Sequence, residues 1–143
     1  MVSSFSERWF FVFLTRIERL IYSLFGSTRA DIRLLIYAIR VVIELHLVQH
    51  IPRADIPVTK TVYPQVAQQL GRSAPATARS IERLANLCWD EVCRQGRILE
   101  LFGREYMAVP SAADVLYYLA YFIYFNKPFF VLFDENDIIH HSL

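Results

Sequence analysis

Side chains that can read DNA bases recur along one face of a predicted helix at residues 73–94. Arginine, glutamate and asparagine stand there at intervals of three or four residues, which brings them to the same side of a helix. Arginine can pair bidentately with guanine and asparagine with adenine, and glutamate can accept a hydrogen bond from cytosine. An ordinary solvated face of mixed charge would show the same pattern. The residues expected to contact bases are Arg79, Ser80, Glu82, Arg83 and Asn86.

A second set of residues is suited to hold DNA phosphates. Basic side chains flank both ends of the same predicted helix, and the backbone N–H groups at a helix N-terminus also favour a phosphate. The residues expected to contact phosphates are Lys60, Arg72, Ser73, Thr77 and Arg97.

The helix that carries these residues follows a shorter one across a glycine. Residues 62–70 form an apolar-periodic stretch that ends at Gly71, and Ser73 can serve as the N-cap of the long helix. Pro75 is tolerated in the first turn because the N–H that it lacks has no helical partner there. This order predicts a helix-turn-helix, in which one helix braces another against the DNA major groove.

Apolar residues predict which side of the long helix faces the core. They recur three, four, seven and eleven residues after the first of them, as on the buried stripe of an amphipathic helix. These residues are Ile81, Leu84, Ala85, Cys88 and Val92.

The rest of the chain also has helical periodicity. Each of the four glycines follows an apolar-periodic stretch and is predicted to end a helix in the left-handed conformation. Ser111 is expected to be the N-cap of the last helix, with Asp114 completing a capping box. The chain is therefore predicted to be all-α, with about six helices and the helix-turn-helix in the middle. The predicted helices are 15–25, 28–49, 62–70, 73–94, 98–102 and 111–125.

These helices divide the chain into an N-terminal extension (1–14), one helical domain (15–125) and an aromatic and acidic C-terminal tail (126–143). Its 143 residues are enough to bury a core, and 55% hydrophobic against 20% charged residues excludes general disorder. The net charge is only +1, but residues 1–53 and 59–104 each carry +3 and residues 105–143 carry −4. This asymmetry is compatible with a nucleic-acid face plus an acidic end, and also with charge scattered for solubility.

The sequence offers little for enzymatic chemistry. His46 and His50 have the spacing of a metal pair on a helix, but no third ligand accompanies them, so a half-buried or surface pair is preferred. Cys88 and Cys93 point to different sides of the long helix and are expected to stay reduced in a cytoplasmic protein. We therefore predict no enzyme activity, no cofactor and no metal.

One apolar stretch, residues 115–133, is long enough to span a membrane. The sequence Asn126-Lys127-Pro128 interrupts it with a charge and a helix breaker. A core or dimer-interface helix is therefore preferred, and no membrane partner is expected.

Several short segments resemble the C-terminal effector domain of the stage-zero sporulation response regulator, the master regulator of endospore formation in Firmicutes. The segments that carry the resemblance are Tyr63-Pro64-Gln65-Val66-Ala67, Ile81-Glu82-Arg83, Gly96, Leu101-Phe102-Gly103 and Pro110–Val115, and the likeness covers about residues 15–125. It implies an all-helical domain that binds double-stranded DNA through the helix containing Ile81-Glu82-Arg83, commonly as a tandem dimer.

The chain departs from this family in two ways that leave its function open. It has no room for the family's receiver domain, and the stretch from Gly71 to Ile81 is about four residues longer, close to one helical turn. The longer stretch means either that the recognition helix starts earlier or that it docks differently. We expect a stand-alone, sequence-specific transcriptional regulator. The alternative is a protein-interaction module that has lost DNA reading and dimerises with, or antagonises, a full-length relative.

Overall fold

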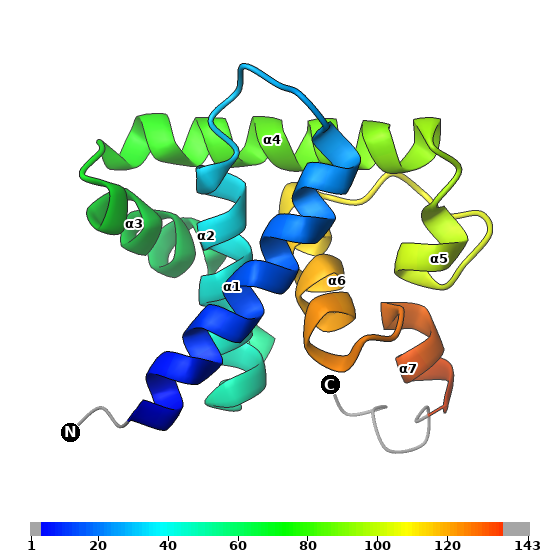
Figure 1. The fold of residues 1–143 in the computed structure, drawn as a ribbon, viewed down its shortest axis with the longest axis horizontal. Coiled ribbons are helices and arrows are strands. Elements are labelled where there is room, and N and C mark those ends of the chain that lie inside the picture. Colours follow the sequence, from blue (N-terminus) through cyan, green and yellow to red (C-terminus); the bar gives the residue numbers. More distant parts are fainter. Residues whose placement is uncertain (1–3, 136–143) are drawn as a thin grey trace.

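The computed structural model describes residues 4–135, and over that range the chain contains seven α-helices and no strand (Figure 1). The all-α prediction is therefore confirmed. In chain order the elements are α1 (Ser4–Phe25), α2 (Arg33–Val42), the π-helical turn η1 (Ile43–Val48), the 3₁₀ turn η2 (Arg53–Asp55), α3 (Val58–Leu70), α4 (Ala74–Arg94), α5 (Ile98–Phe102), α6 (Ala112–Phe125) and α7 (Phe129–Glu135).

Helix α4 lies across the ends of three other helices. In Figure 1, α1, α2 and α6 run beside one another, and α4 crosses them along one side of the molecule while α3 packs beneath its N-terminal half. The core fills the space between these helices with aliphatic side chains, among them Ile39, Leu84 and Leu119, which are fully buried. The position of α4 is thus set by contacts with most of the other long helices.

Three predicted helices differ in extent from those observed, one of them being α3, which was predicted from residue 62 and begins at Val58. The helix predicted to begin at residue 28 begins at Arg33, because side chains engage the backbone before it: Thr28 Oγ1 accepts a bond from the Ala30 N–H, and Asp31 Oδ1 accepts one from the Arg33 N–H. The helix predicted from residue 15 is part of α1, which starts at Ser4.

The second half of the predicted 28–49 helix is π-helical. In η1 the Gln49 N–H donates to the Glu44 carbonyl, five residues earlier, at 2.9 Å. The wider turn ends at His50, which takes the left-handed conformation with φ of 59°.

The C-terminal tail contains a helix that periodicity did not predict. Asn126 ends α6 in the left-handed conformation, and α7 then folds back so that its rings contact those of α6. We call this group the aromatic end; its members are Tyr118, Tyr121, Phe129, Phe130 and Phe133. The break at Asn126 divides the apolar stretch 115–133, and no helix in the described part of the chain is both long and apolar enough to cross a membrane.

Two predictions about helix ends are confirmed. All four glycines have positive φ and follow helices. Ser111 caps α6, and its Oγ accepts a bond from the Asp114 N–H at 3.1 Å. The Asp114 carboxylate, expected to complete a capping box, instead accepts a bond from Arg53 at 2.6 Å. This pair connects η2 to the start of α6.

Candidate nucleic-acid interface

The connection between α3 and α4 is a three-residue turn, Gly71–Ser73. The Gly71 N–H donates to the Gln68 carbonyl and the Arg72 N–H to the Ala67 carbonyl, the two bonds of a Schellman motif. Gly71 has φ of 63°, a conformation that is costly for residues with a Cβ atom. The turn therefore fixes the direction in which α4 leaves α3.

The burial pattern of α4 agrees with the stripe predicted from the sequence. The apolar residues assigned to the inner side are all buried: Ile81, Leu84, Ala85, Cys88 and Val92. Cys88 lies so deep that burial raises the pKa of its thiol to about 12, and neither it nor the exposed Cys93 forms a disulfide. The polar face of α4 consequently points away from the core.

Four of the five predicted base-contacting residues are exposed on this outer face. Arg79, Glu82, Arg83 and Asn86 lie along it, and we call these four side chains the α4 face. Ser80 is half-buried at the flank of this face.

Glu82 of the α4 face acts on Tyr63 in α3. Burial raises the pKa of the Tyr63 hydroxyl, and a hydrogen bond to the Glu82 carboxylate together with its negative charge raises it further. Glu82 is thus held toward α3, which leaves Arg79 and Arg83 as the cations of this face.

Lys60, in the first turn of α3, and Arg72, in the turn between α3 and α4, both have exposed side chains, as a phosphate contact requires. Arg72 forms an ion pair with Asp31, the carboxylate that also binds Arg33 at 2.8 Å. The Arg33 hydrogen bonds are the main reason that the pKa of Asp31 is lowered to about 2. Arg72 therefore has a carboxylate partner that a phosphate would have to replace.

The two hydroxyls predicted to contact phosphate are placed differently from each other. Ser73 is exposed at the N-cap position of α4, but its side chain makes no capping bond; its carbonyl accepts the Thr77 N–H. Thr77 is only 1% exposed, and its Oγ1 is buried without a hydrogen-bond partner. The predicted phosphate contact of Thr77 is corrected, because Thr77 lies on the inner side of the first turn.

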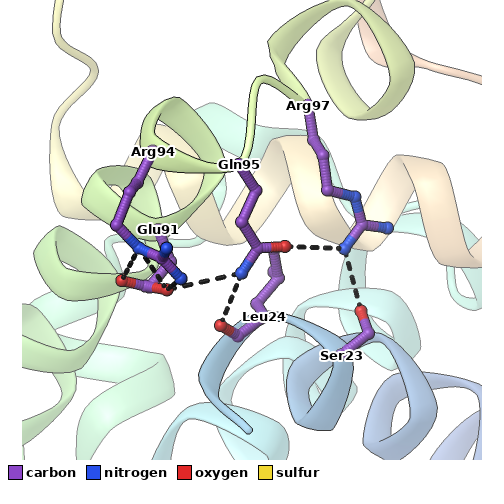
Figure 2. A network of polar contacts seen from close by, with 6 residues as sticks. All are labelled: Ser23, Leu24, Glu91, Arg94, Gln95 and Arg97. Atoms are coloured by element: carbon purple, nitrogen blue, oxygen red, sulfur yellow. Dashed lines mark hydrogen bonds and ion pairs between the residues drawn. The ribbon is translucent and has the colours of Figure 1, made fainter.

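Arg97 is also corrected, from a phosphate contact to a residue that holds helices together. Its Nε and Nη2 donate to Glu100. Its Nη1 donates to Ser23 Oγ in α1 at 3.0 Å, as Figure 2 shows. Next to it, Gln95 Nε2 donates to the Leu24 carbonyl at 2.9 Å. These bonds connect the end of α4 to the end of α1, and they occupy the guanidinium that the sequence had assigned to DNA.

A buried arginine that the sequence did not single out connects α2 to α3. Arg40 is 5% exposed, and its Nη2 donates to Gln69 Oε1 at 2.5 Å near the end of α3. Burial lowers the pKa of Arg40, while Glu44 opposes that shift. Its place beside the inward stripe of α2 was the only local signal, since the partner lies 29 residues away.

Of the two histidines that resembled a metal pair, His46 is hydrogen-bonded within the protein. Both ring nitrogens of His46 have protein partners, the Ile51 carbonyl at 2.7 Å and the Tyr121 hydroxyl at 2.8 Å. Among the residues that the structure describes, no group of three or more His, Cys, Asp or Glu side chains is arranged to hold a metal ion.

None of the protein-family models, curated proteins or solved structures compared with this chain matches it.

Proposed function

We propose that this chain is a sequence-specific DNA-binding transcriptional regulator that acts as a stand-alone effector domain. The observation that carries the proposal is the α4 face: two exposed arginines in the N-terminal half of a helix that follows a tight turn, with an exposed asparagine just past the middle of that helix. In helix-turn-helix proteins the N-terminal residues of the second helix contact base edges. The sequence resemblance to the sporulation effector domain supports the same assignment.

The proposed binding mode gives each group one task. Arg79 and Arg83 pair with guanines, and Asn86 pairs with an adenine, because these side chains match the donors and acceptors of those bases. Lys60 and Arg72 contact phosphates on either side of the groove, with Arg72 exchanging Asp31 for a phosphate. The backbone N–H groups at the start of α4 add a phosphate site.

The test is a fluorescence-anisotropy titration of the full chain with random and selected DNA duplexes at two salt concentrations. Phosphate neutralisation makes affinity fall steeply with salt, so the selected duplex should bind more weakly at the higher concentration. Arg79→Ala/Arg83→Ala should lose about 1–3 kcal/mol of discrimination for each base pair no longer read. Arg19→Ala, which removes an exposed arginine from α1, is the matched control and should bind like the wild type.

A second candidate function is the protein-interaction module that dimerises with a related chain. Two observations favour this function. Phe11 and Val12 on α1 are exposed apolar side chains, and Glu82 places a negative charge within the α4 face, which DNA phosphates would repel. If the folded wild type fails to bind any duplex even at low salt, the DNA-binding proposal is wrong. In that case a change in sedimentation caused by Phe11→Ser would support the interaction module.

A further inference from the structure

A cavity of about 390 Å³ lies between η1, η2, α6 and α7. Its volume falls within the range of about 300–1,000 Å³ that is typical of small-molecule sites. None of the residues assigned to DNA lines it. The lining residues used below are His46, Arg53, Tyr117, Tyr121, Phe129 and Phe133.

One side of the cavity is an aromatic wall. Phe129 and Phe133 stack with their ring centroids 4.2 Å apart, and the Tyr121 ring meets Phe129 edge-on at 5.0 Å. Rings that contact one another in this way present flat apolar surfaces at little entropic cost, since each is already held by its neighbours. This wall suits an aromatic or aliphatic body.

Tyr117, one turn before Tyr121 on α6, also lines the cavity and has a hydroxyl without a hydrogen-bond partner. Tyr117 is 1% exposed, and its hydroxyl oxygen is buried and makes no hydrogen bond. A buried polar atom left unpaired is destabilising, and in native proteins most such atoms are paired. Tyr117 lines the cavity, but its hydroxyl oxygen is not exposed there, so a ligand oxygen accepts from this hydroxyl only when a neighbouring side chain such as Arg53, which lies over the ring, shifts.

A positive charge lies directly beside that tyrosine. The Arg53 guanidinium carbon is 4.1 Å from the Tyr117 ring centroid, and its Nη2 binds Asp114 at 2.6 Å. A guanidinium carries further N–H donors in the same plane, and these match a carboxylate. The Arg53 side chain is half-exposed, so it can shift toward a ligand without disturbing the core.

The remaining polar group of the cavity is already oriented. Since a carbonyl can only accept, His46 Nδ1 donates to Ile51, and Nε2 forms a hydrogen bond with the Tyr121 hydroxyl. The ring sits in the π-helical turn η1, a geometry that is frequent at functional sites. The cavity is therefore preformed.

We propose that this cavity binds a small amphipathic carboxylate. The apolar body packs against the aromatic wall, and the carboxylate accepts hydrogen bonds from Arg53 and Tyr117. The cavity lining contains a guanidinium and, among the described residues, no acidic side chain; the ligand carboxylate shares the Arg53 guanidinium with Asp114, which binds Nη2 from outside the lining. This site is separate from the α4 face, and the inference does not depend on DNA binding.

The test uses 1-naphthoate as the probe, titrated into the full chain by calorimetry and followed by NMR. We expect saturable binding that shifts the resonances of Tyr117, Tyr121 and Phe129. The neutral analogue 1-naphthalenemethanol has the same ring system without the charge and should bind about tenfold more weakly.

Three variants separate binding from folding. Tyr117→Phe removes the unpaired hydroxyl, so it should leave the melting temperature unchanged or higher while weakening naphthoate binding about three- to tenfold. Arg53→Gln should weaken naphthoate about tenfold or more but leave binding of the neutral analogue unchanged. Tyr124→Phe, a matched change on α6 outside the cavity, should alter neither.

Two results would overturn the proposal. One is a folded wild type that shows no saturable naphthoate binding into the millimolar range. The other is binding that survives both Tyr117→Phe and Arg53→Gln, because the ligand would then occupy a different place.

Discussion

The α4 face and the aromatic end are built in opposite ways. The side chains of the α4 face come from a single helix, project into solvent and owe their positions to helical geometry. The rings of the aromatic end come from two helices and touch one another at centroid distances between 4.2 and 6.0 Å. Substitutions on the α4 face should therefore change binding with little change in stability, whereas substitutions at or beneath the aromatic end should destabilise the fold.

The largest effect on stability is expected from removing the ring that connects α4 to the aromatic end. Phe102 is fully buried, with its centroid 5.8 Å from that of Trp89 on α4 and 5.5 Å from that of Tyr118 on α6. Phe102→Ala should lower the free energy of unfolding by about 3–5 kcal/mol in urea denaturation. Leu99→Ala, at a 59% exposed position of the same short helix, should stay within about 0.5 kcal/mol. Equal effects would mean that α5 does not bridge the regions.

Two glycines test how firmly α7 is docked. Gly96 and Gly103 both have positive φ, so alanine at either should cost about 1–2 kcal/mol. A Cβ atom at Gly103 would also lie 2.9 Å from the Val131 nitrogen of α7, whereas one at Gly96 meets nothing within 4 Å. Gly103→Ala should therefore be the more destabilising in urea denaturation, by at least about another 1 kcal/mol. If the two variants have the same free energy of unfolding, α7 can move away from the added methyl group without a loss of stability.

Two arginines near the end of α4 differ in whether they bind within their own helix or to another helix. Arg97 is 22% exposed and connects Glu100 to Ser23, whereas Arg94 is mostly exposed and pairs with Glu91 within the same helix (Figure 2). Arg97→Ala should cost about 1 kcal/mol of stability because it removes the hydrogen bonds that connect Glu100 in α5 to Ser23 in α1. Arg94→Ala should cost no more than about 0.5 kcal/mol, since exposed pairs within one helix contribute little.

Thermal unfolding of the two variants, measured side by side, provides this test. A larger loss for Arg94→Ala would show that the connection to α1 does not hold the end of α4.

The smallest effect is expected at the turn side of α4, where Asp31 binds Arg33 and Arg72. The folded-state pKa of Asp31, about 2, lies below its ordinary value of 3.8, so its stabilising contribution is present above about pH 4 and is lost as the pH falls toward 2. Because these pairs are partly exposed, the contribution should not exceed about 1 kcal/mol.

The measurement is the stability of the wild type and Asp31→Asn between pH 6 and pH 2.5. The difference between the two should shrink on acidification. A constant difference would show that the charge of Asp31 is not what stabilises this corner.

Local sequence signals predicted what depends on neighbours along the chain. The apolar period placed Ile81 and Leu84 inside and left Arg79 and Arg83 outside, because a helix repeats its faces whatever surrounds it. The serine at position 111 predicted a capped helix start for the same reason.

What the sequence did not predict depends on partners far along the chain. Arg97 looked like a phosphate contact because its partner in α1, Ser23, lies 74 residues away. The aromatic cavity was missed for the same reason: Arg53 meets Asp114 across 61 residues, and His46 meets Tyr121 across 75. Thr77 was predicted on the outer side of α4 but lies on the inner side, because a threonine is equally compatible with either side of a helix.

The π-helical turn of η1 sets the register between the first half of the chain and the cavity. A π turn holds one more residue than an α turn, so deleting a single residue from Ile43–Val48 would let α2 continue as a regular helix. The wider turn keeps the later side chains in register: if the same residues were wound as an α-helix, the side chains beyond the turn would be rotated by about 100° about the helix axis. His46 would then turn away from both Ile51 and Tyr121. The π turn thus absorbs one residue more than an α turn holds and still leaves His46 facing its partners near the cavity.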